Sequence, residues 1–234
     1  MQNLNFLNYN DLELNSLDYS EALKIDNRSF LQYYLSLLKN KHPLIFPFCQ
    51  KKDYNIFIIK ICLFFVFFTI YYVINTLFFD LTAIHKIYID AGKYNISFFF
   101  PQIIISFIIA YHINIAIKYF SLSERNLLEI KKKPNIESAK EIKPNVERCI
   151  IIKNICYFII SIIFLILFWY YLSSFSAVYK NSQIYLITNT FISFILGLIY
   201  PFFINLVPMF LRLISLGAKN RECIYKMSKI LQIL

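Results

Sequence analysis

The sequence predicts an all-α, polytopic integral membrane protein: a four-helix transmembrane bundle preceded by a cytosolic amphipathic in-plane helix. Four long apolar runs cover residues 56–79, 98–120, 154–178 and 184–211, and each reaches the ~20 residues that a helix needs to cross ~30 Å of hydrocarbon. The 234 residues are 58% hydrophobic, with a mean hydropathy of +0.54, above the ~45–50% of soluble domains. A soluble domain would have to bury all four runs in one small core, which argues against that class.

The distribution of positive charge predicts how the chain threads the membrane. Nineteen of the 24 Lys and Arg residues lie in residues 1–55, in the 121–153 loop or after the fourth run, and the loops at 80–97 and 179–183 hold only three. Cytosolic loops are enriched in Lys and Arg, so we expect both termini and the middle loop in the cytosol. Orientation thus explains the net charge of +10 without nucleic acid, and we expect anionic lipids at the cytosolic face.

Residues 1–55 form the predicted cytosolic N-terminal region. Residues 1–29 hold five acidic and two basic residues, which is not the pattern of a signal peptide. An amphipathic helix is predicted at about residues 29–40, because its apolar side chains share one helical face (Phe30, Tyr33, Tyr34, Leu37 and Leu38). This helix either lies in the plane of the membrane or packs onto the cytosolic end of the bundle.

The transmembrane domain is predicted over residues 56–211, with crossings at 56–79, 98–120, 154–178 and 184–206. Between the second and third crossings, the 121–153 loop carries eight basic and five acidic residues. Ser121 and Glu124 fit a capping box, so a short helix is expected to about Lys132, broken by Pro134 and Pro144. The loop is expected to be a solvated linker or a docking loop for a partner.

The fourth run is longer than one straight crossing. Its 28 residues include Pro201 and Pro208, with Asn205 between them, and proline bends a helix by removing a backbone hydrogen bond. We expect a kink before Pro201, an interfacial stretch over 207–216, and a basic cytosolic tail over 212–234.

Four polar side chains inside the runs are the candidate functional residues: His112, Asn114, Asn189 and Asn205. They would either line a polar or proton-conducting path or form interhelical hydrogen bonds, each contributing ~0.6 kcal/mol. The runs contain no Asp or Glu, and the chain has three glycines. Carboxylates and broken, glycine-rich helices are typical of transporters and channels, so these absences argue against that class.

Neither catalysis nor a cofactor is predicted. Three glycines cannot supply a phosphate-binding loop or a nucleophile elbow, and His42 and His85 are expected on opposite sides of the membrane, where they cannot share a metal. We therefore expect no enzyme, metal or cofactor.

All five cysteines lie on the predicted cytosolic side, where thiols stay reduced. Four lie close enough to the membrane for S-palmitoylation, the alternative being inert thiols: Cys49, Cys149, Cys156 and Cys223.

Several blocks of the sequence also carry a resemblance that would cover about residues 18–216. They are residues 18–42, 53–65, 85–88 (HKIY), 120–131 (LSLSERNLLEIK) and 186–212. They resemble a large group of uncharacterised multi-spanning membrane proteins from unicellular eukaryotes with AT-rich genomes. The resemblance implies a eukaryotic membrane protein and transfers no activity.

The expected function is a non-catalytic membrane anchor, scaffold or assembly subunit. Its partners would be the lipid bilayer, other membrane proteins or further copies of the chain. The alternative is a small channel or transporter subunit that uses the four polar side chains.

Overall fold

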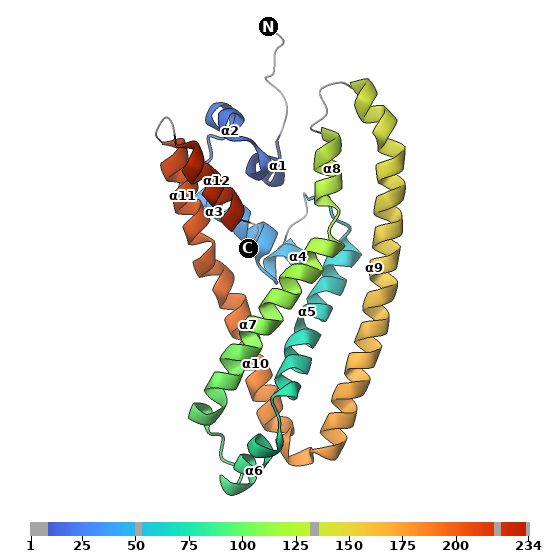
Figure 1. The fold of residues 1–234 in the computed structure, drawn as a ribbon, viewed down its shortest axis with the longest axis vertical. Coiled ribbons are helices and arrows are strands. Elements are labelled where there is room, and N and C mark those ends of the chain that lie inside the picture. The colour runs from blue at the N-terminus through green and yellow to red at the C-terminus, as the bar shows by residue number, and fades with distance from the viewer. Residues whose placement is uncertain (1–8, 50–52, 132–135, 218–220, 233–234) are drawn as a thin grey trace. The chain divides into compact units, whose positions relative to one another are not determined.

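The computed structural model describes residues 9–49, 53–131, 136–217 and 221–232 (Figure 1). Within these ranges the chain forms helices and no strand. Four stretches are long and apolar enough to cross a membrane: Phe57–Leu77, Ile96–Ser121, Lys140–Val178 and Lys180–Leu216. This confirms the all-α fold with four candidate spans. The chain divides into two compact units, residues 55–198 and residues 1–54 with 199–234.

The unit of residues 55–198 is organised around its first long helix. Helix α5 (Phe57–Leu77) lies between α7 (Ile96–Ser121) and α9 (Ile136–Val178), as Figure 1 shows, and packs closely against both. Half of the most apolar window of α5 is buried, against 6% for α9. Most of this window of α9 is therefore exposed in the described chain.

Aromatic packing joins α5 to α10 (Gln183–Ile204). Phe194 of α10 contacts the rings of Phe67 and Tyr71 of α5 at centroid distances of 5.7 and 5.8 Å. Gly197, one turn further along α10, faces the Tyr71 ring so closely that a Cβ atom there would overlap the Tyr71 hydroxyl. This close approach is a reason for one of the three glycines to stand at position 197.

Local capping sets the ends of the shorter segments. The Asp80 side chain accepts a hydrogen bond from the Ala83 amide at the start of α6 (Leu81–Ile89), and Asn95 caps α7 in the same way through Phe98. Helix α6 ends in a turn in which Ala91 and Gly92 have positive φ angles of 46° and 81°, the left-handed conformation common at helix C-termini. A short 3₁₀ helix, Lys180–Ser182, joins α9 to α10.

The segment between the second and third spans differs from the expected linker. Helix α8 (Glu124–Lys131) is present, but the Ser121 hydroxyl donates to the Lys118 carbonyl instead of capping α8. Helix α9 already begins at Ile136 and keeps Pro144 inside it. The prediction that Pro144 ends the helix is wrong: α9 continues through it and loses only the one backbone hydrogen bond that proline cannot donate. The prediction for Pro134 lies outside the described residues.

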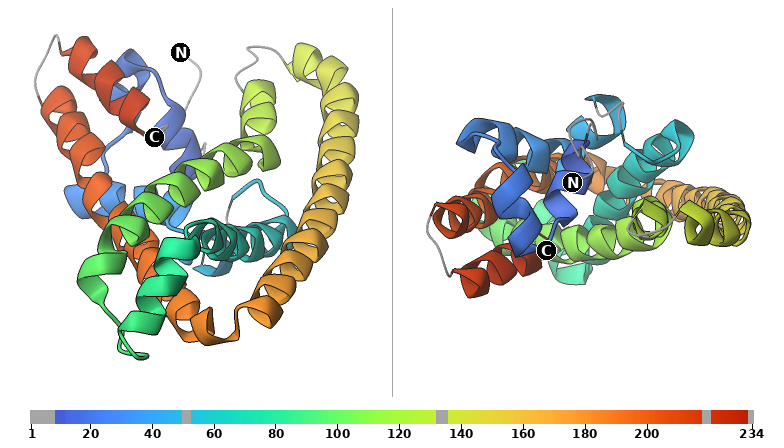
Figure 2. Two further views of the ribbon diagram at one scale, coloured as in Figure 1. Left: turned by 60° about the horizontal axis from the view of Figure 1, so that its bottom comes forward. Right: turned by 90° about the horizontal axis from the view of Figure 1, so that it is seen from above.

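The second unit joins both ends of the chain. It contains α1 (Asp11–Ser16), α2 (Tyr19–Ile25), α3 (Phe30–Lys41), α4 (Ile45–Cys49), the end of α10, α11 (Leu206–Leu216) and α12 (Glu222–Leu231). Helices α11 and α12 lie side by side (Figure 2) and make the most extensive helix–helix packing in the described chain. Two small cores hold the unit together, one around Tyr225 with Leu17 and Ala22, the other around Tyr33 with Leu37 and Met209.

Helix α3 occupies the region predicted to be amphipathic. Ser29 and Gln32 form its capping box, and Tyr33, Leu37 and Leu38 are buried on one face, packed within this unit against α11. Phe30 on the same predicted face is exposed. The position of α3 in the plane of a membrane stays a prediction.

Candidate functional site

No hydrogen bond joins any two of the four polar candidates in the described part of the chain. His112 is exposed, and its Nδ1 lies 2.7 Å from the Ile108 carbonyl of its own helix. Asn114 is buried on α7. Asn189 belongs to α10 in the unit of residues 55–198, whereas Asn205 belongs to the other unit.

Asn189 takes part in a buried hydrogen-bonded chain that links three segments. The Tyr94 hydroxyl donates to Asn189 Oδ1 at 2.5 Å, and the Ser193 hydroxyl donates to the Asn189 carbonyl at 2.8 Å. Asn75 of α5 donates from Nδ2 to Ser193 Oγ at 2.7 Å and to the Tyr71 carbonyl at 2.8 Å. Neither Asn75 nor Ser193 is among the residues predicted from the sequence. The presence of an asparagine inside the first apolar run could have indicated Asn75.

Further polar atoms of α7 and α10 are buried without a hydrogen-bond partner in the described part of the protein. On α7, Gln102, Ser106 and Asn114 are spaced by four and eight residues, so they share a helical face. Thr190 Oγ1 on α10 is also buried and unpartnered. Such atoms are rare in native interiors and need a physical account.

Asn205 lies at the interruption between the two helices of the fourth candidate span. It separates α10 from α11, and its Nδ2 donates to the Pro201 carbonyl at 2.7 Å. Pro201 lies inside α10 and Pro208 in the first turn of α11. The described break is therefore at Asn205, four residues after Pro201.

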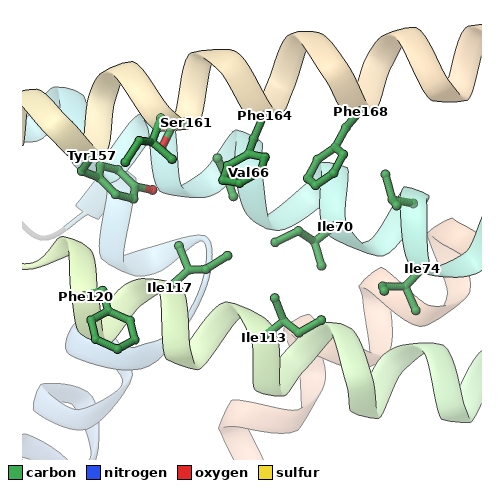
Figure 3. A pocket seen from close by; sticks show the side chains of 12 residues that line it. Val66, Ile70, Ile74, Ile113, Ile117, Phe120, Tyr157, Ser161, Phe164 and Phe168 are labelled. Carbon is green, nitrogen blue, oxygen red and sulfur yellow. The ribbon is translucent and has the colours of Figure 1, made fainter.

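An apolar groove of about 400 Å³ lies between α5, α7 and α9 (Figure 3). Val66 and Ile70 come from α5, Ile113 and Ile117 from α7, and Phe164 from α9. The remaining lining residues are also apolar except Tyr157 and Ser161, which both lie near one end of the groove in Figure 3. This arrangement can hold a hydrocarbon group, and it offers no lining for ions.

A second hollow of about 1160 Å³ is more polar and lies between two turns of the same unit. Its walls come from the segment between Ile84 and Gly92 and from residues 178–185. Lys180, Asn181 and Gln183 contribute the polar part. Close to it in the sequence, Lys86 pairs with Asp90 at the end of α6 at 3.0 Å.

The strongest electrostatic feature lies in the unit that joins the two chain ends, centred on Arg212 of α11. Arg212 is 2% exposed, and its Nη2 donates to Asp26 Oδ2 at 2.7 Å and to the Leu14 carbonyl at 2.8 Å. Asp26 also accepts two hydrogen bonds from the guanidinium of Arg28, at 2.8 and 2.9 Å. We call Asp26, Arg28 and Arg212 the arginine cluster.

Two aromatic rings enclose the arginine cluster. The Arg212 guanidinium lies 5.0 Å from the Tyr33 ring centroid and 4.7 Å from that of Tyr225, a cation–π arrangement that favours a buried cation. The Tyr225 hydroxyl donates to the Leu17 carbonyl at 2.8 Å. The cluster thus ties α11 and α12 to the segment that includes α1, α2 and α3.

The protonation states within the cluster follow from burial and charge. Burial raises the pKa of Asp26, but the hydrogen bonds and charges of Arg28 and Arg212 outweigh it and hold this pKa below the ordinary 3.8. Burial raises the pKa of Tyr225 to about 12, although the charge of Arg212 opposes it. At neutral pH Asp26 is therefore ionised and Tyr225 is neutral. These fixed protonation states suit a structural ion pair that holds helices together, and do not suit proton transfer.

The sequence predicts that Arg212 belongs to a basic cytosolic tail, and its burial was not expected. The signal for its burial is its place on one face of an apolar segment, with Pro208, Met209 and Ser215 as its buried neighbours at helical spacing. A buried arginine requires an acidic partner, and five of the 14 acidic residues of the chain lie before residue 30.

The cysteines form no disulfide in the structure. Cys62 is buried, and the four candidates for palmitoylation, Cys49, Cys149, Cys156 and Cys223, are exposed. Their lipidation stays a prediction. Across the described ranges, no group of three His, Cys, Asp or Glu side chains is placed to hold a metal.

In comparisons with known proteins, no protein-family model, curated protein or solved structure matches the chain.

Proposed function

We propose that the chain is a non-catalytic membrane anchor or scaffold subunit, in which four membrane-spanning helices carry a small helical unit for partners. The observation that carries this proposal is that no hydrogen bond joins any two of the polar candidates in the described residues. His112 is exposed and Asn205 is bonded to its own helix, as expected for side chains with structural roles.

The exposed surface of the third span supports an assembly role. Only 6% of the most apolar window of α9 is buried, against 50% for α5. Before this window, α9 extends through the exposed residues Glu141, Lys143, Glu147 and Arg148. A helix with one end apolar and the other charged offers contacts both to partner spans and to a soluble partner.

The charge distribution supports a cytosolic position for the helical unit and the start of α9. These parts contain most of the 24 Lys and Arg residues, and positive residues near membrane ends are retained in the cytosol. We propose that anionic lipids contact this side. We also propose, from the resemblance of the sequence blocks, that the chain is related to uncharacterised multi-spanning proteins of unicellular eukaryotes. This relation implies no activity.

Affinity purification in mild detergent tests the scaffold function. We expect partner proteins at a fixed ratio to the chain, and a charge reversal at Glu141, Lys143, Glu147 and Arg148 should release partners that dock on the first turns of α9. The same substitutions at Lys226 and Glu222, an exposed pair on α12, are the control. A pure homo-oligomer that conducts ions in planar bilayers would contradict the proposal.

A small channel or transporter subunit is the second candidate function. The chain of hydrogen bonds from Tyr94 through Asn189 and Ser193 to Asn75 favours it, since buried polar groups in a membrane span are costly and often functional. Ion flux into liposomes that contain the protein tests this function. Flux that the Asn75→Leu variant loses and the His112→Leu variant keeps would establish it. Absence of flux in the unmodified protein would remove it.

A further inference from the structure

The apolar groove between α5, α7 and α9 has a buried floor and an exposed rim. Val66, Ile70 and Ser161 are 4–6% exposed, whereas Ile160 and Phe164 are about half exposed. When the three helices span a bilayer, the exposed rim meets hydrocarbon. The groove therefore opens sideways to lipid.

The length of the groove matches one leaflet of a membrane. Its lining residues on α9 run from Tyr157 to Phe168 (Figure 3), which at 1.5 Å per residue is about 16 Å. The hydrocarbon of a bilayer is about 30 Å thick, or about 15 Å per leaflet. An occupant of this length would reach from the polar boundary of the membrane to its middle.

One end of the groove lies next to a polar layer. Four residues before Tyr157, the Lys153 ammonium donates to the Leu122 carbonyl at 2.6 Å. Beside it, the Ser123 amide donates to Asn55 Oδ1 at 3.2 Å. The other end, at Ile74 and Phe168, has only apolar lining residues. A lipid whose headgroup lies at the polar layer would direct its chain into the groove.

The shape of the groove suits a slender apolar occupant. Its volume of about 400 Å³ extends along about 16 Å of α9, and its walls are almost entirely apolar side chains. A single file of methylene groups, which contact their neighbours at about 4 Å, can follow such a groove.

We propose that the groove is a binding site for one acyl chain of a phospholipid in the leaflet next to Lys153. The acyl chain lies along α9 from Tyr157 to Phe168 and covers Val66 and Ile70. Its binding fills the space between helices that otherwise contact one another mainly through α5.

Photolabelling in lipid nanodiscs tests the site directly. The full chain is placed in phosphatidylcholine nanodiscs that contain a small fraction of phosphatidylcholine with a diazirine in one acyl chain. After illumination, we expect adducts on Val66 and Ile70, which line the floor of the groove and contribute little to the outer surface of the helices.

Two matched substitutions on α7 separate the groove from the lipid-facing surface. Ile113 lines the groove and is 37% exposed, and Ile109, one turn away, is 39% exposed without lining it. Ile113→Phe fills the groove, so adducts on Val66 and Ile70 should fall about tenfold, the factor that 1.4 kcal/mol of lost contact gives. Ile109→Phe should leave them unchanged. Both variants must keep the melting temperature and the elution volume of the unmodified protein.

Three outcomes would overturn the proposal. Adducts confined to exposed positions of α9 such as Ile159 and Ile163 would show that lipid stays outside the groove. Equal labelling of Val66 in the Ile113→Phe and Ile109→Phe variants would show the same. Cross-links between two copies from an Ile70→Cys variant would assign the groove to protein side chains.

Discussion

At the scale of single residues, the arginine cluster is the most consequential feature of the protein. Two guanidinium groups share the carboxylate of Asp26, and the side chains of Asp26 and Arg212 are 3% and 2% exposed. Removing one partner of a buried ion pair leaves the other charge buried without compensation, which destabilises the fold strongly. Replacing the whole pair with apolar residues would cost much less. The cluster therefore makes the association of α11 with the N-terminal helices sensitive to one side chain.

Replacing Asp26 with Asn tests this sensitivity. Asp26→Asn leaves the charges of Arg28 and Arg212 buried together, so we expect the free energy of unfolding to fall by ~3–5 kcal/mol. Asp18→Asn is the matched control: Asp18 pairs with Lys229 at 3.0 Å but is 79% exposed, so its loss should cost ~0–1 kcal/mol. Denaturant titration in detergent measures both, and equal shifts would contradict the burial argument.

The acid sensitivity of the same unit follows from the pKa of Asp26. Because Arg28 and Arg212 hold this pKa below the ordinary 3.8, the stabilisation is complete above about pH 3.8 and is lost as the pH falls through the lower value of the folded state. We expect the difference in stability between the unmodified protein and Asp26→Asn to shrink only below that pH. A constant difference between pH 2 and pH 5, measured in a non-ionic detergent, would contradict this.

The residues also show what sequence alone can predict. That His112, Asn114, Asn189 and Asn205 are polar groups in apolar runs is plain from the sequence, but their partners depend on helix rotation. Helix α7 has no strong amphipathic face to fix this rotation, so nothing in its sequence distinguishes exposed His112 from buried Asn114. The role of Arg212 required knowing that both ends of the chain fold together.

At the scale of elements, the number and type of the spans were predictable because their length exceeds what a soluble core needs. Their ends were harder. Proline rules suggested a break at Pro144, yet α9 runs through it for 43 residues, and the break in the fourth span is at Asn205. Proline affects one backbone hydrogen bond, and packing or water decides whether that loss ends the helix.

The contact of α10 with α5 gives a test at this scale. Gly197→Ala places a methyl group against the buried Tyr71 ring, and we expect a loss of ~1–3 kcal/mol of stability from overpacking. In a Tyr71→Phe background, which removes the first atom that the methyl group meets, the loss should be smaller. Thermal unfolding of the four proteins in detergent measures the coupling, and additive losses would show that the two residues do not contact.

At the scale of the whole molecule, the chain has four candidate spans, and the distribution of charge predicts their orientation in the membrane. The structure has helices of sufficient length and hydropathy, and the excess of Lys and Arg in alternate loops predicts which side each loop occupies. If both statements hold, the helical unit, the start of α9 and the C-terminal helix share the cytosol, where they would meet partners.

Sided labelling of single-cysteine variants tests this central claim most directly. The variants keep Cys149 or Cys223, or carry Lys93→Cys or Asn181→Cys, all at exposed positions. A membrane-impermeant maleimide should label Cys149 and Cys223 once digitonin opens the plasma membrane and not in intact cells. The cysteines at 93 and 181 should label either in intact cells or only after all membranes are dissolved. Labelling of position 181 together with Cys149, or different behaviour of Cys149 and Cys223, would contradict the four-span topology.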